Sequence, residues 1–71
     1  MKLQITSEQD LGACIRSRRN ELELTQGELA DVSGVTLRFV SELERGKATA
    51  QYDGIRRVLA SLGLDLYVEP R

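Results

Sequence analysis

The apolar positions of this chain recur every three or four residues over most of its length, which is the spacing of amphipathic α-helices. The first helix is expected to begin after Ser7, whose hydroxyl can cap the free backbone N–H groups of a helix start. It is expected to run to about Leu22. Its core-facing stripe is Leu11, Ile15 and Leu22, with Cys14 beside it.

Two shorter helices are predicted within residues 25–46. Thr25 is followed by Glu28 at the spacing of a capping box, in which two side chains satisfy backbone N–H groups at a helix start. Gly34 can adopt the positive φ that a sharp turn after a helix requires, and Thr36 can cap the second helix. The inward-facing residues of the two helices are expected to be Leu29, Ala30, Val32, Val40 and Leu43.

A last helix is predicted over residues 52–62, and a different pattern follows it. Gly46 and Gly63 are expected to end the third and fourth helices. Residues 64–69 alternate between apolar and polar positions, as in a β-strand, and Pro70 ends the alternation. The inward residues of the last helix are expected to be Tyr52, Ile55, Val58, Leu59 and Leu62.

The strand predicted at residues 64–69 needs a partner, because a single strand leaves backbone groups unpaired on both edges. Three partners are open: a short N-terminal strand at residues 2–6, the same strand of a second subunit, or another protein. We favour the second subunit, since two-fold pairing would complete the core of so small a chain. The dimerisation residues would be Leu64, Leu66, Tyr67 and Val68.

Composition limits the chemistry. The chain has 71 residues, enough for one domain, with no histidine and one cysteine, Cys14. It therefore offers no internal disulfide, no Cys/His metal site and no Cys–His nucleophile pair. No apolar run reaches membrane length. We expect a protein of the bacterial cytoplasm, associated with the nucleoid, that is not an enzyme and has no cofactor, metal or small-molecule substrate.

Two helices joined by a short glycine-containing turn form a helix-turn-helix, whose second helix can lie in the DNA major groove. The net charge of −1, from ten Lys and Arg against eleven Asp and Glu, predicts weak non-specific binding to DNA. Positive charge nevertheless gathers near the second motif helix, at Arg38, Arg45 and Lys47. Useful affinity would therefore need base contacts and two half-sites.

The stretches IRSRRNELELTQGELADVSGV and VSELERGK resemble the Xre-type helix-turn-helix repressors, which include the phage repressors. The closing LASLGLDLYVEP and the short length are similar to the HipB-type antitoxins. The resemblance implies a mainly α domain over residues 1–71, with four to five helices, the motif at residues 25–46 and a dimerisation strand at residues 64–69.

The resemblance also implies roles for individual residues. Arg38 is the strongest candidate for reading a base, because a guanidinium can bind guanine O6 and N7 together. Leu37 and the methyl group of Thr36 could touch a thymine methyl, whereas Glu42 could accept from cytosine N4 or repel phosphate. The full set of base-reading candidates is Thr36, Leu37, Arg38, Ser41 and Glu42.

Two further groups complete the implied site. Gln26 at a helix start, with Arg45 and Lys47, would bind DNA phosphates, although ordinary surface positions remain an alternative for all three. Arg19 and Glu44 match positions that form an ion pair beneath the motif in the phage repressors. That pair would orient helices rather than bind DNA.

These features predict a homodimeric repressor that binds an inverted-repeat DNA operator. The HipB resemblance adds an antitoxin that regulates its own operon and has a HipA-like kinase toxin as partner. The alternatives are an autonomous phage-type repressor, and an antitoxin for which DNA binding is secondary. A helix-turn-helix kept only as a dimerisation scaffold is a further alternative.

Overall fold

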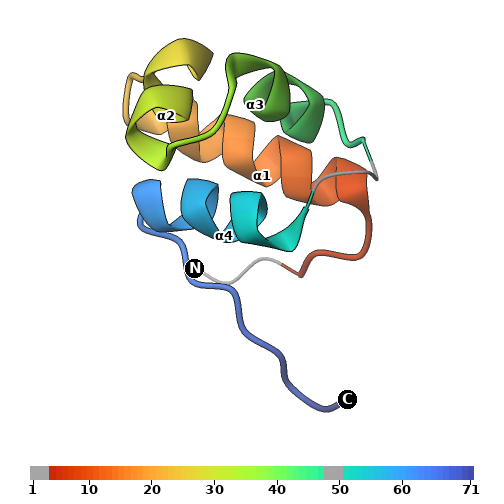
Figure 1. Cartoon of the computed structure of the whole chain (residues 1–71). Coiled ribbons are helices and arrows are strands. Elements are labelled where there is room, and N and C mark those ends of the chain that lie inside the picture. Colours follow the sequence, from red (N-terminus) through yellow and green to blue (C-terminus); the bar gives the residue numbers. More distant parts are fainter. Residues whose placement is uncertain (1–3, 48–50) are drawn as a thin grey trace.

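The computed structural model describes residues 4–47 and 51–71, and within these ranges the chain forms four α-helices. They are α1 (Glu8–Glu21), α2 (Gln26–Ser33), α3 (Leu37–Glu44) and α4 (Tyr52–Ser61). Helix α3 packs against both α1 and α2, and α4 packs mainly against α2. Figure 1 shows α1 crossing the middle of the molecule, with the chain leaving α4 toward the C-terminus. The mainly helical architecture is confirmed.

Three of the four helices begin where the capping residues predict. Ser7, Thr25 and Thr36 each accept a hydrogen bond from the backbone N–H three residues later, at 3.0 or 3.1 Å. The capping box is complete, because Glu28 Oε1 also accepts from the Thr25 N–H at 2.8 Å. Local side-chain chemistry therefore sets the start of both motif helices.

The turn of the motif depends on Gly34. Its φ of 71° is left-handed, a conformation that costs little only for glycine. The turn lets the Val35 N–H donate to the Ala30 carbonyl oxygen at 3.1 Å, so that Val35 is half-buried beneath it. This geometry sets the sharp change of direction between α2 and α3.

The core is a single cluster to which every helix contributes. Its buried apolar residues are Ile15, Leu29, Ala30, Val40, Leu43, Val58, Leu59 and Leu62. Ala30 is 2% exposed, and its small side chain lets α2 lie close to its neighbours.

Three residues expected in the core are exposed. Val32 is 66% exposed because the buried arc of α2 passes through Leu29, Ala30 and Ser33, and Val32 lies about 60° outside it. Leu22 follows the last residue of α1 and so leaves its stripe.

Tyr52 is the third exposed residue, at 64% exposure. The first turn of α4 instead presents Gly54 to the Phe39 ring, which lies too close to leave room for a Cβ at this position. Tyr52 is about 200° around the helix from Gly54 and therefore faces outward.

Residues 64–69 form no strand in the part of the chain that the structure describes. Leu64 packs against the core, whereas Leu66, Tyr67 and Val68 are exposed on the segment that runs away from the helices in Figure 1. Residues 4–6 are likewise not in a strand, and positions 2 and 3 of the proposed N-terminal strand lie outside the described residues. The strand and its pairing between subunits stay predictions.

Candidate nucleic-acid interface

The C-terminal end of α3 is fixed to α1 by an ion pair. Arg19 Nε lies 2.6 Å from Glu44 Oε2, and Arg19 Nη2 lies 3.0 Å from Glu44 Oε1. The two side chains are 12% and 3% exposed. Arg19 Nη1 also donates to the Leu24 carbonyl oxygen at 2.7 Å, so the same side chain holds the loop before α2. The pair lies within the bundle and beneath α3.

Gln26 joins this network, because its Nε2 donates to Glu44 Oε1 at 3.0 Å. Burial on its own would raise the pKa of Glu44, but the hydrogen bonds from Arg19 and Gln26 outweigh it and lower that pKa. The hydrogen bond to Glu44 raises the pKa of Arg19 in turn. The Gln26 side chain therefore helps to orient α3, and its assignment to a DNA phosphate stays a proposal.

Close approach between α1 and α3 depends on Gly12, a residue that sequence analysis missed. A Cβ at this position would lie 2.5 Å from the Leu43 carbonyl oxygen and 2.7 Å from that of Glu44. Arg16 Nη2 donates to the same Glu44 oxygen at 3.3 Å. The only sequence signal for the contact between α1 and α3 is that Gly12 lies within a helix, at a spacing that places it on the core-facing side.

The outer surface of the motif is formed by the start of α3. Thr36, Leu37 and Arg38 are exposed, and the Arg38 side chain is 84% exposed. Ser41 and Glu42, one turn later, are partly exposed. All five base-reading candidates thus lie outside the core on one short helix and its cap. We call this set, Thr36, Leu37, Arg38, Ser41 and Glu42, the α3 surface.

Ion pairs link the α3 surface to one of the phosphate candidates. Glu42 Oε2 accepts from Arg38 Nε at 3.2 Å and from Lys47 Nζ at 3.0 Å. The hydrogen bonds from Lys47 and then Arg38 lower the pKa of Glu42. Arg45, another of the three expected phosphate contacts, is exposed at the end of α3. The structure therefore brings Arg38 and Lys47 to one carboxylate.

Helix α4 holds the motif from the other side. Ser33 Oγ donates to Ser61 Oγ at 2.9 Å, and Ser61 Oγ donates to the Arg57 carbonyl oxygen at 3.1 Å. Arg57 Nη1 lies 3.5 Å from the carbonyl oxygen of Gly34 in the turn. The end of α2 and the turn are therefore attached to the helix that leads into residues 64–69.

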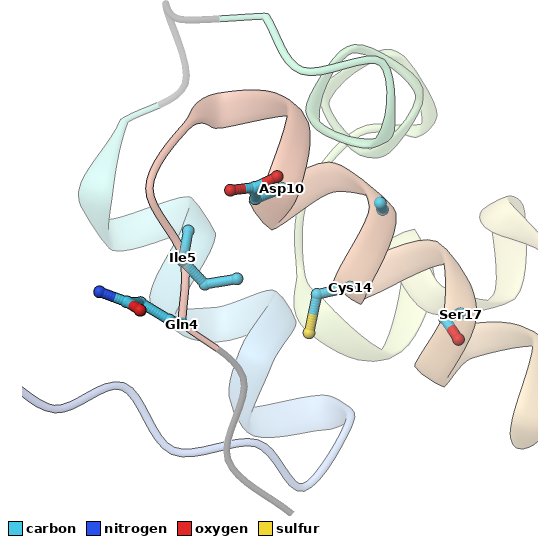
Figure 2. A pocket seen from close by; sticks show the side chains of 6 residues that line it. Gln4, Ile5, Asp10, Cys14 and Ser17 are labelled. Atoms are coloured by element: carbon cyan, nitrogen blue, oxygen red, sulfur yellow. The ribbon is translucent and has the colours of Figure 1, made fainter.

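Cys14 is half-buried on α1, at a shallow pocket of about 290 Å³. Figure 2 shows its thiol beside Ile5, with Gln4 at the edge. This is the position expected for a residue flanking the core stripe. None of the described helices is both long enough and apolar enough to cross a membrane.

Comparison with known proteins agrees with this geometry. The family model described as helix-turn-helix matches residues 15–68. An HTH-type transcriptional regulator, y4mF of Sinorhizobium fredii, is 46% identical over 66 residues, which cover 93% of this chain and 87% of that protein. The ImmF control region 10 kDa protein of Bacillus phage phi105 is 33% identical over 58 residues, covering 82% of this chain and 64% of that protein.

Solved structures show the same fold. A HipB–O2 20mer complex has a TM-score of 0.88 at 23% identity, covering 99% of this chain and 97% of that chain. A HipA–HipB–O2–O3 complex has a TM-score of 0.87, also at 23% identity, covering 97% of both chains. The clp gene regulator ClgR of Corynebacterium glutamicum has a TM-score of 0.74 at 34% identity, covering 87% of this chain and 66% of that chain.

The helix-turn-helix family model and the y4mF relative both indicate a transcriptional regulator. The likeness to HipB concerns the fold, and it agrees with the resemblance in the sequence. The chain therefore belongs to the Xre-type helix-turn-helix family of transcriptional regulators.

Proposed function

We propose that this protein is a sequence-specific DNA-binding repressor that acts as a homodimer on an inverted-repeat operator. The observation that carries the proposal is the exposed α3 surface above a buried anchor: Arg38 extends into solvent while Glu44, six residues later, is held by Arg19. A helix fixed at its base can present side chains to base edges with little loss of order on binding.

Charge supports the need for two subunits. The chain has a net charge of −1, so a single subunit gains little from the phosphate backbone. Two α3 helices placed about 34 Å apart would contact successive major grooves and combine their base contacts. The operator is then a pair of short, inverted half-sites.

Residues 64–69 are the proposed contact between subunits. All of them except Val68 line a groove of about 970 Å³ together with Ile5, Leu11, Cys14 and Leu59. Leu66 and Val68 are exposed along the same segment. An exposed alternating segment beside an apolar groove favours pairing with the same segment of a second copy.

A role as an antitoxin is a second, compatible proposal. The fold matches HipB in a complex with an O2 20mer and in a complex with HipA, O2 and O3. We infer a HipA-like kinase as the candidate partner in the cytoplasm, with repression of the shared operon. The relative from a phage control region instead favours an autonomous repressor.

Gel shifts with the protein's own upstream DNA test the first proposal. We expect a discrete complex that forms at lower protein concentration than on a shuffled sequence and weakens steeply as salt rises. Equal affinity for both DNAs would contradict sequence-specific binding. Co-expression with the product of the neighbouring gene, followed by size-exclusion chromatography, tests the antitoxin role: co-elution supports it, and separate elution argues for an autonomous repressor.

A further inference from the structure

Glu42 is a carboxylate at a surface proposed to face DNA, where negative charge opposes binding. Its Oε2 accepts hydrogen bonds from Arg38 Nε and Lys47 Nζ at once, at 3.2 and 3.0 Å. The Glu42 side chain is only 23% exposed, against 84% for Arg38 and 55% for Lys47. The carboxylate therefore lies back against the helix while both cations extend beyond it.

The atoms used in this cluster matter for recognition. Arg38 donates to Glu42 through Nε, which is on the side of the guanidinium. A bidentate contact with guanine O6 and N7 can use the two terminal nitrogens, Nη1 and Nη2. The bond to Glu42 is thus compatible with a guanine contact and restricts the directions in which Arg38 can point.

The cluster of Glu42, Arg38 and Lys47 also weakens contacts with DNA phosphates, which carry no sequence information. Phosphate binding depends on net positive charge, and Glu42 partly neutralises both Arg38 and Lys47. A phosphate close to these cations would also lie close to the carboxylate. A guanine edge carries no net charge and therefore meets less repulsion from Glu42.

We propose that Glu42 is a positioning residue that sets the DNA specificity of the α3 surface, by bracing Arg38 for guanine and by suppressing phosphate binding through Arg38 and Lys47. The proposal rests on the proposed function. In this proposal Glu42 makes no base contact of its own and instead affects specificity through Arg38.

Two substitutions separate the two effects. Glu42→Gln keeps an oxygen that can accept from Arg38 but removes the charge, so binding to random DNA should tighten, and most at low salt. The slope of log K against log salt should steepen by about 0.9 for each additional phosphate that the protein neutralises. Glu42→Ala also removes the brace, so its operator affinity should fall relative to Glu42→Gln.

Asp53→Asn is the matched control. Asp53 pairs with two arginines, Arg56 at 2.9 Å and Arg57 at 3.1 Å, but on α4 rather than α3. The substitution makes the same change in net charge and also releases two cations. Its ratio of operator to random affinity should stay at the wild-type value, whereas that of Glu42→Gln should fall. Equal falls in both variants would mean that only net charge matters and would overturn the proposal.

A mutant cycle tests whether Glu42 acts only through the two cations that it binds. In a protein that carries both Arg38→Ala and Lys47→Ala, Glu42→Ala should no longer lower the operator preference. A persistent loss would assign Glu42 a base contact of its own and overturn the proposal. The failures of the two proposals can be told apart. A wild-type protein that binds operator and random DNA equally refutes sequence-specific binding. If the wild type prefers the operator and Glu42→Gln has the same ratio of operator to random affinity, only the role of Glu42 is refuted.

Discussion

Arg19 and Glu44 form two hydrogen bonds in parallel, with Nε–Oε2 and Nη2–Oε1 distances of 2.6 and 3.0 Å, between the first and third helices. Both side chains are largely removed from water. Arg19→Ala would leave a buried carboxylate without its main partner, so the free energy of unfolding should fall by about 3–5 kcal/mol. Urea unfolding followed by circular dichroism measures the change.

Arg56→Ala is the control for this substitution, because Arg56 pairs with the exposed Asp53 on the surface of α4. Its urea midpoint should stay close to that of the wild type. If Arg19→Ala unfolds at the wild-type midpoint as well, the Arg19–Glu44 pair does not stabilise the fold.

Acid should destabilise the protein through Glu44. The pKa of Glu44 is lowered from its ordinary value of 4.5, so the folded state binds a proton less readily than the unfolded chain. The stability that this group contributes is complete above that value and is lost as pH falls through the lowered pKa. Urea midpoints measured between pH 7 and pH 3 should therefore decline.

Glu44→Gln isolates the contribution of Glu44 to acid sensitivity, because a glutamine side chain does not titrate. The variant should be less stable than the wild type at pH 7, and the difference should narrow as pH falls. The pKa values of Asp10, Glu42 and Asp53 are also lowered, but these groups titrate in both proteins and cancel in the comparison. Parallel curves for the two proteins would assign the acid sensitivity elsewhere.

Gly12 should not tolerate a methyl group. In Gly12→Ala the new Cβ would meet the Leu43 carbonyl oxygen at 2.5 Å, which forces α1 and α3 apart and should cost about 1–3 kcal/mol. Gly27→Ala is the matched control: the nearest atom to its Cβ is Thr25 Oγ1 at 3.8 Å, and alanine is the better helix former. Opposite shifts in melting temperature are expected, downward for Gly12→Ala and upward for Gly27→Ala.

Arg38→Ala should lower discrimination more than total affinity. The loss of a bidentate guanine contact is worth about 1–3 kcal/mol per half-site, whereas the phosphate contacts remain. Titrations of operator and shuffled DNA at one salt concentration give the ratio. A ratio equal to that of the wild type would remove Arg38 from the base-reading set.

Leu66→Pro tests the proposed contact between subunits. Proline removes a backbone N–H and cannot be accommodated within a strand ladder, so the variant should sediment as a monomer and bind a single half-site weakly. Leu66→Val, which favours strand geometry, should remain dimeric. A dimeric Leu66→Pro protein would place the subunit interface outside residues 64–69.

The helix starts could be predicted because their causes are local. A hydroxyl at Ser7, Thr25 or Thr36 caps backbone groups only three residues away. The left-handed turn at Gly34 likewise depends on the residue itself. These features form regardless of which residues pack around them.

The remaining features depend on which helix lies opposite, and a single helix does not contain that information. Val32 satisfies helical periodicity, yet Ser33 takes the buried place because it can bond to Ser61. Gly12 is notable only once α3 is seen to approach it. The second hydrogen bond that Glu42 accepts, from Lys47, crosses the end of α3 and has no helical spacing to reveal it.

The burial of Leu43 and Glu44 limits how much sequence one subunit can recognise. Helix α3 has eight residues, and the last two, Leu43 and Glu44, are buried, so only exposed residues before them can address bases. In the proposed dimer each subunit would read a half-site of only a few base pairs, and such short sequences recur by chance throughout a genome. Selection of a unique promoter would then depend on the orientation and separation of two half-sites. In that sense residues 64–69 would choose the target gene as much as α3 does.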